Sequence, residues 1–306
     1  MQTYDLKEVL CTVIAIPITP FTAGGQVDFV AYRRLIGHLV EGGVTVVTPN
    51  GNTGEFYSLS PDECRGTVEV AVEVVSGRAL VVAGVGFDVA TAIEMARFAR
   101  QVGAGAIMVH QIIHPYRTHQ GWVAYHQAVA EAVPELGIVP YVRDDLVTPA
   151  MIGELLEACP NIVGVKYAVP DPLLFASIVR VVGAERLAWV CGIAESWAPF
   201  FWVGGARGFT SGLINVHPKL SLDMLGCLRA GDYLGAMHIW SRLKPFEDLR
   251  SRLSNGNNVS VIKEAMAQIG FCGRTVRPPI SELPDREQAE VAAILSAWGL
   301  QVPARA

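Results

Sequence analysis

One lysine occupies an unusual place in this sequence. The chain contains five lysines, and four of them lie in stretches that are typical of helices. Lys166 instead lies inside the apolar run NIVGVKYAV (161–169), which is typical of a buried strand. Burial lowers the pKa of a lysine, and a neutral amine is the nucleophile that forms a Schiff base with a ketone. Lys166 is therefore a candidate catalytic residue. The alternative is a strand-end lysine whose amine reaches solvent or a carboxylate.

Two side chains near the end of the preceding predicted strand complement this lysine. Tyr141 lies at the end of GIVPYV (137–142), where a phenol can carry protons to and from the carbon skeleton of an imine. The alternative for Tyr141 is a rim aromatic with a solvated hydroxyl. Arg143 follows, and a guanidinium is suited to a substrate carboxylate. The alternative for Arg143 is a salt bridge with Asp144 or Asp145.

A glycine-rich segment, PNGNTGEFYSL (49–59), follows another predicted strand. Gly51 and Gly54 allow the backbone to turn tightly, so that amides and the Thr53 hydroxyl can face a binding site. Such a turn is suited to an anionic carboxylate, although it also fits an ordinary connection between a strand and a helix.

Two further groups carry weaker signals. His110, His114 and His119 are close in sequence, but their spacing matches no helical metal motif, so we expect no metal site. The segment GGARGFTSG (204–212) resembles a phosphate-holding loop and equally fits a glycine-rich strand start.

The elements that must position these residues alternate regularly along the chain. Eight short apolar runs alternate with amphipathic segments, most of them in units of about 25–30 residues, and three further helices follow. Short strands that are apolar throughout are typical of parallel sheets buried on both faces. The pattern therefore predicts a (β/α)8 TIM barrel over 1–231 and a C-terminal three-helix extension over 232–306, and it disfavours an open doubly wound sheet.

Composition excludes several classes of protein. A formal net charge of −5 argues against a nucleic-acid-binding protein, and 51% hydrophobic residues exclude a disordered chain. No apolar stretch is long enough to span a membrane, and the N-terminal residues do not resemble a signal peptide. None of the six cysteines forms a Cys-x-x-Cys pair, so we expect a cytoplasmic protein.

Together these features resemble the dihydrodipicolinate synthase / N-acetylneuraminate lyase family of class I aldolases and dehydratases. The similarity begins at IPITPFTAGGQVD (16–28), continues in GNTGEFYSLSPDE (51–63), and includes Tyr141 and the NIVGVK stretch that ends in Lys166. The resemblance implies a (β/α)8 barrel with a C-terminal helical extension and assembly as a homo-oligomer, either a tetramer or a dimer.

The resemblance also implies roles for the candidate residues. Lys166 would form the Schiff base with a 2-keto acid, and Tyr141 would transfer protons. Thr53 would bind the substrate carboxylate and orient the tyrosine. The family usually has Thr or Ser before this threonine, whereas this chain has Asn52, whose amide can donate a hydrogen bond. Gly51 would support the same carboxylate site. No metal or organic cofactor is implied.

Departures from the synthase pattern point to one branch of the family. The run Tyr141-Val142-Arg143-Asp144 resembles the Tyr-Asn-Arg-Asp of 5-dehydro-4-deoxyglucarate dehydratases, as do GEFYSL and the segment 259–283. The resemblance therefore implies a decarboxylating dehydratase of a 2-keto-3-deoxy sugar acid that yields 2,5-dioxopentanoate. Arg143 would bind the distal carboxylate, and Ser211 on the eighth strand would face the substrate hydroxyls.

The sequence is also compatible with other activities. A retro-aldolase would release pyruvate from a related substrate, and a condensing enzyme like dihydrodipicolinate synthase is a further alternative. The segment QIIHPY (111–116) replaces the aromatic pair of the synthases, which removes the tyrosine that the partner subunit contributes to their proton relay. A non-catalytic keto-acid sensor is the third alternative.

Overall fold

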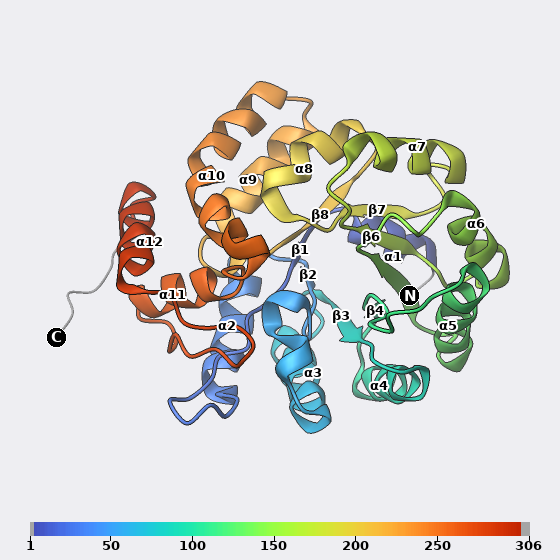
Figure 1. Cartoon of the computed structure of the whole chain (residues 1–306), viewed down its shortest axis with the longest axis horizontal. Coiled ribbons are helices and arrows are strands. Elements are labelled where there is room, and N and C mark those ends of the chain that lie inside the picture. Colours follow the sequence, from blue (N-terminus) through green and yellow to red (C-terminus); the bar gives the residue numbers. More distant parts are fainter. Residues whose placement is uncertain (1–2, 301–306) are drawn as a thin grey trace.

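Eight short strands form the centre of the molecule, which the computed structural model describes over residues 3–300. The strands are β1 (Val13–Ala15), β2 (Val46–Val47), β3 (Leu80–Val85), β4 (Ala106–Val109), β5 (Gly137–Val142), β6 (Gly164–Tyr167), β7 (Ala188–Cys191) and β8 (Gly208–Ser211). Each strand pairs in parallel with its neighbours in sequence, and β1 pairs with β8 to close the barrel (Figure 1). The predicted (β/α)8 barrel is confirmed.

Twelve α-helices surround and extend this barrel within residues 3–300. They are α1 (Thr3–Leu10), α2 (Phe29–Glu41), α3 (Pro61–Val75), α4 (Val89–Val102), α5 (His119–Ala132), α6 (Pro149–Ala158), α7 (Pro172–Val182), α8 (Ala194–Val203), α9 (Pro218–Arg229), α10 (Tyr233–Asn255), α11 (Ser260–Gln268) and α12 (Asp285–Ala297). Helix α3 begins with a capping box. The Ser60 hydroxyl accepts from Glu63 N at 3.3 Å, and the Glu63 carboxylate accepts from Ser60 N at 2.9 Å.

Side chains alternate between the inside of the barrel and the layer beneath the helices. Ile14, Val82 and Met108 belong to the interior cluster, whereas Val165 and Tyr167 pack into the larger core between strands and helices. This alternation follows from the two-residue period of a strand. It decides which residues near the C-terminal strand ends can reach a ligand.

Helix α1 covers the N-terminal end of the barrel and is not predicted by the sequence pattern. Its Leu6 and Leu10 are buried against the interior cluster, close to the start of β5 and the start of β6. Because this end is filled with apolar side chains, an open site is left at the opposite, C-terminal end of the strands.

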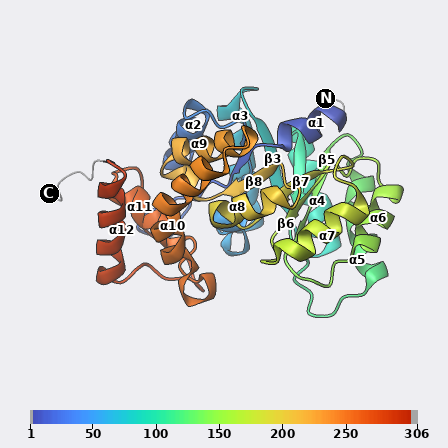
Figure 2. The same ribbon diagram turned by 90° about the horizontal axis from the view of Figure 1, so that it is seen from above.

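Three helices follow the barrel, as predicted. Helix α10 packs against α8 and α9, while α11 and α12 lie on the side of the molecule away from α5 and α6 (Figures 1 and 2). Phe246 of α10 and Met266 of α11 belong to the same buried cluster as the barrel helices. Among residues 3–300, no helix has the length and apolar character that a membrane span requires.

Candidate active site

Lys166 lies on β6 with its side chain inside the barrel. The two flanking residues of the strand point outward, so Lys166 faces a cavity of about 980 Å³ at the C-terminal ends of the strands. Its side chain is buried, with 4% of the residue exposed. Burial, and secondarily the positive charge of Arg143, lower the pKa of Lys166 to about 7. A substantial fraction of the amine is therefore neutral at neutral pH and can act as a nucleophile.

Tyr141 lies beside this amine on the adjacent strand. It is the register partner of Lys166 in the pairing of β5 with β6, and Lys166 Nζ lies 3.9 Å from the centre of the tyrosine ring. Burial raises the pKa of Tyr141 above its usual value. The phenol is therefore protonated at neutral pH and can donate a proton next to the amine.

The glycine-rich segment forms a short 3₁₀ helix, η1 (Asn52–Gly54), after β2. Asn52 Nδ2 donates to the Tyr141 hydroxyl oxygen at 3.4 Å, and both Asn52 and Thr53 line the cavity. The residue that contacts the tyrosine is thus Asn52, whereas the family resemblance implied Thr53. The Thr53 hydroxyl has no hydrogen-bond partner in the described part of the chain, which leaves it free for a ligand.

Gly51 has a different part in the same segment. A Cβ atom at this position would lie 2.4 Å from Ile16 Cγ2, so only glycine allows the segment to pack against β1 and its following residues. Gly51 does not line the cavity, and its carbonyl accepts from Gly54 N at 2.9 Å. Its contribution to the site is the position of the loop.

Arg143 lines the cavity and extends from the segment after β5. The alternative of a salt bridge to Asp144 is not observed, because Asp144 pairs with Arg117 and accepts a hydrogen bond from Gln111 Nε2 at 2.6 Å. Gln111 Oε1 also accepts from Arg143 N at 3.2 Å, so the segment after β4 holds the backbone of the segment after β5. The Arg143 guanidinium has no carboxylate partner within residues 3–300.

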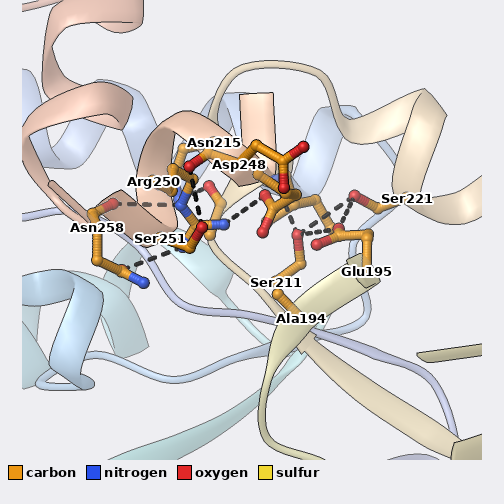
Figure 3. A network of polar contacts seen from close by, with 12 residues as sticks. Ala194, Glu195, Ser211, Asn215, Ser221, Asp248, Arg250, Ser251 and Asn258 are labelled. Carbon is orange, nitrogen blue, oxygen red and sulfur yellow. Dashed lines mark hydrogen bonds and ion pairs between the residues drawn. The ribbon is translucent and has the colours of Figure 1, made fainter. Parts of the chain in front are cut away.

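Ser211 does not reach the cavity, contrary to the expectation that it faces the substrate. Its hydroxyl contacts the Glu195 carboxylate, which also accepts from the Ser221 hydroxyl at 2.5 Å (Figure 3). The strand alternation gives the physical reason. Thr210 points inward and lines the cavity, so Ser211, the next residue of β8, points outward beneath the helices.

The sequence did not predict that Glu195 is buried beneath the helices or that the C-terminal helices contribute to the cavity. Burial, with a smaller contribution from the Glu247 carboxylate, raises the pKa of Glu195 to about 7. Part of the cavity wall comes from α10 and the residues after it: Lys244, Glu247, Asp248, Arg250, Ser251, Asn255, Asn258 and Val259. Glu195 follows β7 closely, and this position could have drawn attention to it. The local sequence of the α10 residues does not indicate that they return to the ends of the strands.

The three histidines have separate surroundings: His114 Nδ1 lies 2.8 Å from the Tyr116 carbonyl oxygen, and His119 Nε2 lies 2.7 Å from the Glu154 carboxylate. His110 is buried, its Nε2 lies 2.7 Å from the Asn50 carbonyl oxygen, and its ring stacks on Phe56. Burial lowers the pKa of His110 to about 3, so this imidazole is neutral. Within the described residues, no group of three or more His, Cys, Asp or Glu side chains is arranged to hold a metal ion.

Comparison with known proteins identifies relatives along nearly the whole chain. Residues 10–298 match the Dihydrodipicolinate synthetase family. A probable 5-dehydro-4-deoxyglucarate dehydratase of Bradyrhizobium diazoefficiens is 33% identical over 290 residues, which cover 92% of this chain and 90% of the relative. A protein of the same description from Rhodococcus opacus is 34% identical over 289 residues, covering 92% of this chain and 93% of the relative.

Solved structures agree on the fold but carry a different name. The dihydrodipicolinate synthase of Bacillus clausii is 43% identical, with a TM-score of 0.93 over 96% of this chain and 100% of that one. The enzyme of the same name from Oceanobacillus iheyensis is 38% identical, with a TM-score of 0.94 over 98% of this chain and 100% of that one. The chain therefore belongs to the dihydrodipicolinate synthetase family, and it is a lyase.

Proposed function

We propose that this chain is a Schiff-base-forming, decarboxylating dehydratase of a six-carbon 2-keto-3-deoxy sugar acid of the 5-dehydro-4-deoxyglucarate type. The observation that carries the proposal is the buried Lys166 amine, with its pKa lowered to about 7, beside the Tyr141 ring in a large open cavity. The lysine imine itself supplies the electron sink, so the proposed reaction needs no further cofactor.

The proposed reaction begins at the ketone. Carbons are numbered here from the carboxylate next to the ketone. The neutral Lys166 amine attacks C2, and Tyr141 protonates the departing oxygen, so that water leaves and a protonated imine forms. The imine withdraws electrons and acidifies C3. Tyr141 or a water removes a C3 proton, and the C4 hydroxyl leaves as water to give a conjugated imine.

The distal carboxylate then leaves as CO2. The electron pair of the C5–C6 bond moves through the conjugated system to the imine nitrogen, which leaves C5 as an enol. The enol becomes an aldehyde by protonation at C4, C3 takes up a proton, and water hydrolyses the imine to release 2,5-dioxopentanoate and the Lys166 amine. One water and one CO2 are lost in total, which balances the six-carbon substrate against the five-carbon product.

The residues around Lys166 have assigned parts in this proposal. Thr53 and Asn52 bind the C1 carboxylate, because their polar groups line the cavity next to Tyr141. Asn52 also donates a hydrogen bond to the Tyr141 hydroxyl, and it stands at the position before Thr53 where the family usually has Thr or Ser. Arg143 binds the C6 carboxylate, since its guanidinium faces the cavity without a carboxylate partner in the described part of the chain.

The names of the relatives support two activities. The curated relatives compared above are named dehydratases, whereas the solved structures at 43% and 38% identity are named dihydrodipicolinate synthases. The arginine position favours the dehydratase, because Arg143 lies two residues after Tyr141, as in the Tyr-Asn-Arg-Asp pattern. A condensing synthase is the second candidate, favoured by the higher identity to those structures.

Two measurements test the proposed function. Borohydride reduction with pyruvate should leave a covalent adduct on Lys166, located by peptide mass spectrometry, and Lys166→Arg should give none. With 5-dehydro-4-deoxyglucarate, the enzyme should release CO2 and 2,5-dioxopentanoate. Release of pyruvate would instead indicate a retro-aldolase. Binding of keto acids without an adduct or turnover would indicate a sensor and overturn the proposal.

We also propose that the chain forms a homo-oligomer, a tetramer or a dimer, in the cytoplasm. The segments after β4 and β5 expose the apolar residues Ile113, Tyr116 and Leu146, which a second copy of the chain could cover. All six cysteines are free, which fits a reducing compartment. Light scattering on the purified protein measures the oligomeric state.

A further inference from the structure

The C-terminal extension contributes a wall of the cavity for which the mechanism above has no use. Three neutral polar residues of this wall, Ser251, Asn255 and Asn258, line the same cavity as Lys166. We call them the neutral wall. They lie at the end of α10 and in the segment that leads to α11, more than 80 residues after the catalytic lysine in sequence.

The charged residues around the neutral wall are already paired with one another. Arg250 Nη1 lies 2.5 Å from Glu247 Oε1, and both side chains are buried. Lys244 pairs with Asp248 one turn away on the same helix. Each cation of this wall is therefore paired with an anion of the wall. The Arg143 guanidinium, in contrast, has no carboxylate partner in the part of the chain described. A substrate carboxylate is accordingly attracted to Arg143, and the neutral wall suits an uncharged polar group.

Hydrogen bonds determine what the neutral wall can offer. Arg250 Nη2 donates to Asn258 Oδ1 at 3.1 Å, and Arg250 Nε donates to the Asn258 carbonyl oxygen at 3.2 Å (Figure 3). These bonds fix the orientation of the Asn258 amide and leave its Nδ2 group as a donor. The Ser251 hydroxyl donates to the Asp248 carbonyl oxygen at 2.9 Å, so its own oxygen is left as an acceptor. One donor and one acceptor together match a hydroxyl group, which both accepts and donates.

The backbone of this segment is held in an unusual conformation. Leu253, Ser254 and Asn255 all have positive φ values, of 55°, 55° and 70°, although none is glycine. Such a left-handed turn is costly for residues with a side chain and persists where surrounding contacts hold it. Here Arg252 pairs with Glu290 at 2.7 Å on α12, which anchors the turn from the side away from the cavity.

A second bond anchors the far end of the turn. Asn257 Nδ2 donates to Glu287 Oε2 at 2.8 Å, and Glu287 also belongs to α12. The turn is thus fixed by Arg250 on the barrel side and by α12 on the outer side. The chain maintains a costly backbone conformation at the place where it presents polar groups to the cavity.

We propose that Ser251, Asn255 and Asn258 bind the C5 hydroxyl of the substrate and make the enzyme selective for keto acids that carry a hydroxyl at that carbon. This assignment rests on the proposed function and adds a specificity site to it. A site built to hydrogen-bond a hydroxyl discriminates against analogues without it, because its polar groups then stay unpaired.

Two variants and one control test the assignment. Asn258→Asp keeps the acceptor oxygen for Arg250 but removes the Nδ2 donor, and Ser251→Ala removes the acceptor. Ser254→Ala is the control, since Ser254 lies in the same turn and does not line the cavity. Each variant is assayed for kcat/KM with 5-dehydro-4-deoxyglucarate and, separately, for borohydride trapping with pyruvate, which has no hydroxyl to contact the wall.

We expect Asn258→Asp and Ser251→Ala each to lower kcat/KM by about tenfold, mainly through KM, with pyruvate trapping and the control unchanged. Equal loss with both ligands, or loss with neither, would overturn the assignment while the proposed function stands. Absence of an adduct in the unaltered enzyme would instead defeat the proposed function itself.

Discussion

At the scale of single residues, two opposing forces act on the Lys166 amine. The Tyr141 ring at 3.9 Å attracts the ammonium form by about 0.5–2 kcal/mol. The pKa of Lys166 falls from 10.5 to about 7, which corresponds to about 5 kcal/mol against the ammonium form. Burial is therefore the larger effect, and the ring serves mainly to keep the amine in place beside the phenol.

The charge of Arg143 gives a pH-dependent prediction. Imine formation requires the neutral amine, so the rate of pyruvate trapping should rise with pH through about 7, the pKa of Lys166. Arg143 lowers this pKa, and Arg143→Gln should therefore raise it and move the rising limb to higher pH. Cyanoborohydride trapping across a pH series measures the limb.

The matched control for this charge change is Arg100→Gln. Arg100 pairs with Glu135 on the outside of the barrel and makes no contribution to the lowered pKa of Lys166. Its pH profile should coincide with that of the unaltered enzyme. The electrostatic explanation would be contradicted if the rising limb of the pH profile stays in place in Arg143→Gln, or if it moves equally in both variants.

At the scale of elements, a buried ion pair joins the C-terminal extension to the loop that carries Thr53. Lys263 of α11 lies 2.5 Å from Glu55, which follows η1, and neither side chain is accessible to solvent. Lys263 Nζ also donates to the Thr275 carbonyl oxygen at 2.8 Å, and Arg277 N donates to Glu55 Oε2 at 3.0 Å. The position of the loop that carries Thr53 thus depends on elements at the far end of the chain.

Breaking this pair should strongly destabilise the protein. Lys263→Met leaves the Glu55 charge buried without its partner, which costs about 3–5 kcal/mol of the free energy of unfolding. The double variant Lys263→Met/Glu55→Gln removes both charges and should recover most of the loss. Guanidinium unfolding followed by tryptophan fluorescence and circular dichroism measures these differences.

Lys219→Met is the control for loss of a lysine in an ion pair. Lys219 pairs with Asp223 on α9, but both side chains are largely exposed, so the cost should stay below about 1 kcal/mol. A double variant no more stable than Lys263→Met would contradict the view that the unpaired Glu55 charge causes the loss.

The sequence predicted the elements better than the contacts between them. The alternation of apolar runs and amphipathic segments indicates eight strands, and a lysine in one apolar run indicates Lys166. It is harder to predict which residues of a strand point into the barrel. Strand β8 is only four residues long, and a shift of one residue exchanges Thr210 for Ser211 as the inward-facing residue. Lys263 is recognisably helical, yet a helix pattern does not reveal that this lysine is buried against Glu55.

At the scale of the whole molecule, the cavity belongs to both the barrel and the extension. The barrel supplies Lys166 and Tyr141, while α10 and the turn after it supply the neutral wall. The shared cavity could not be predicted from the local sequence pattern, because it depends on how the last three helices return to the C-terminal ends of the strands. The division into 1–231 and 232–306 stays a prediction.

We expect that residues 1–231 do not form a stable barrel without the extension. Removal of 232–306 would expose apolar residues of the barrel helices that α10 now covers, and it would remove Lys263, the partner of the buried Glu55. The loss of Lys263 falls next to the loop of Thr53.

The full chain should accordingly unfold in one transition. Differential scanning calorimetry of the full chain should give a single transition, and the 1–231 fragment should lack near-ultraviolet circular dichroism. A 1–231 fragment that is monomeric and cooperatively folded would show that the extension is a separate domain. Because an isolated barrel would lack part of the cavity wall, its trapping of pyruvate would then measure how much of the site the barrel provides by itself.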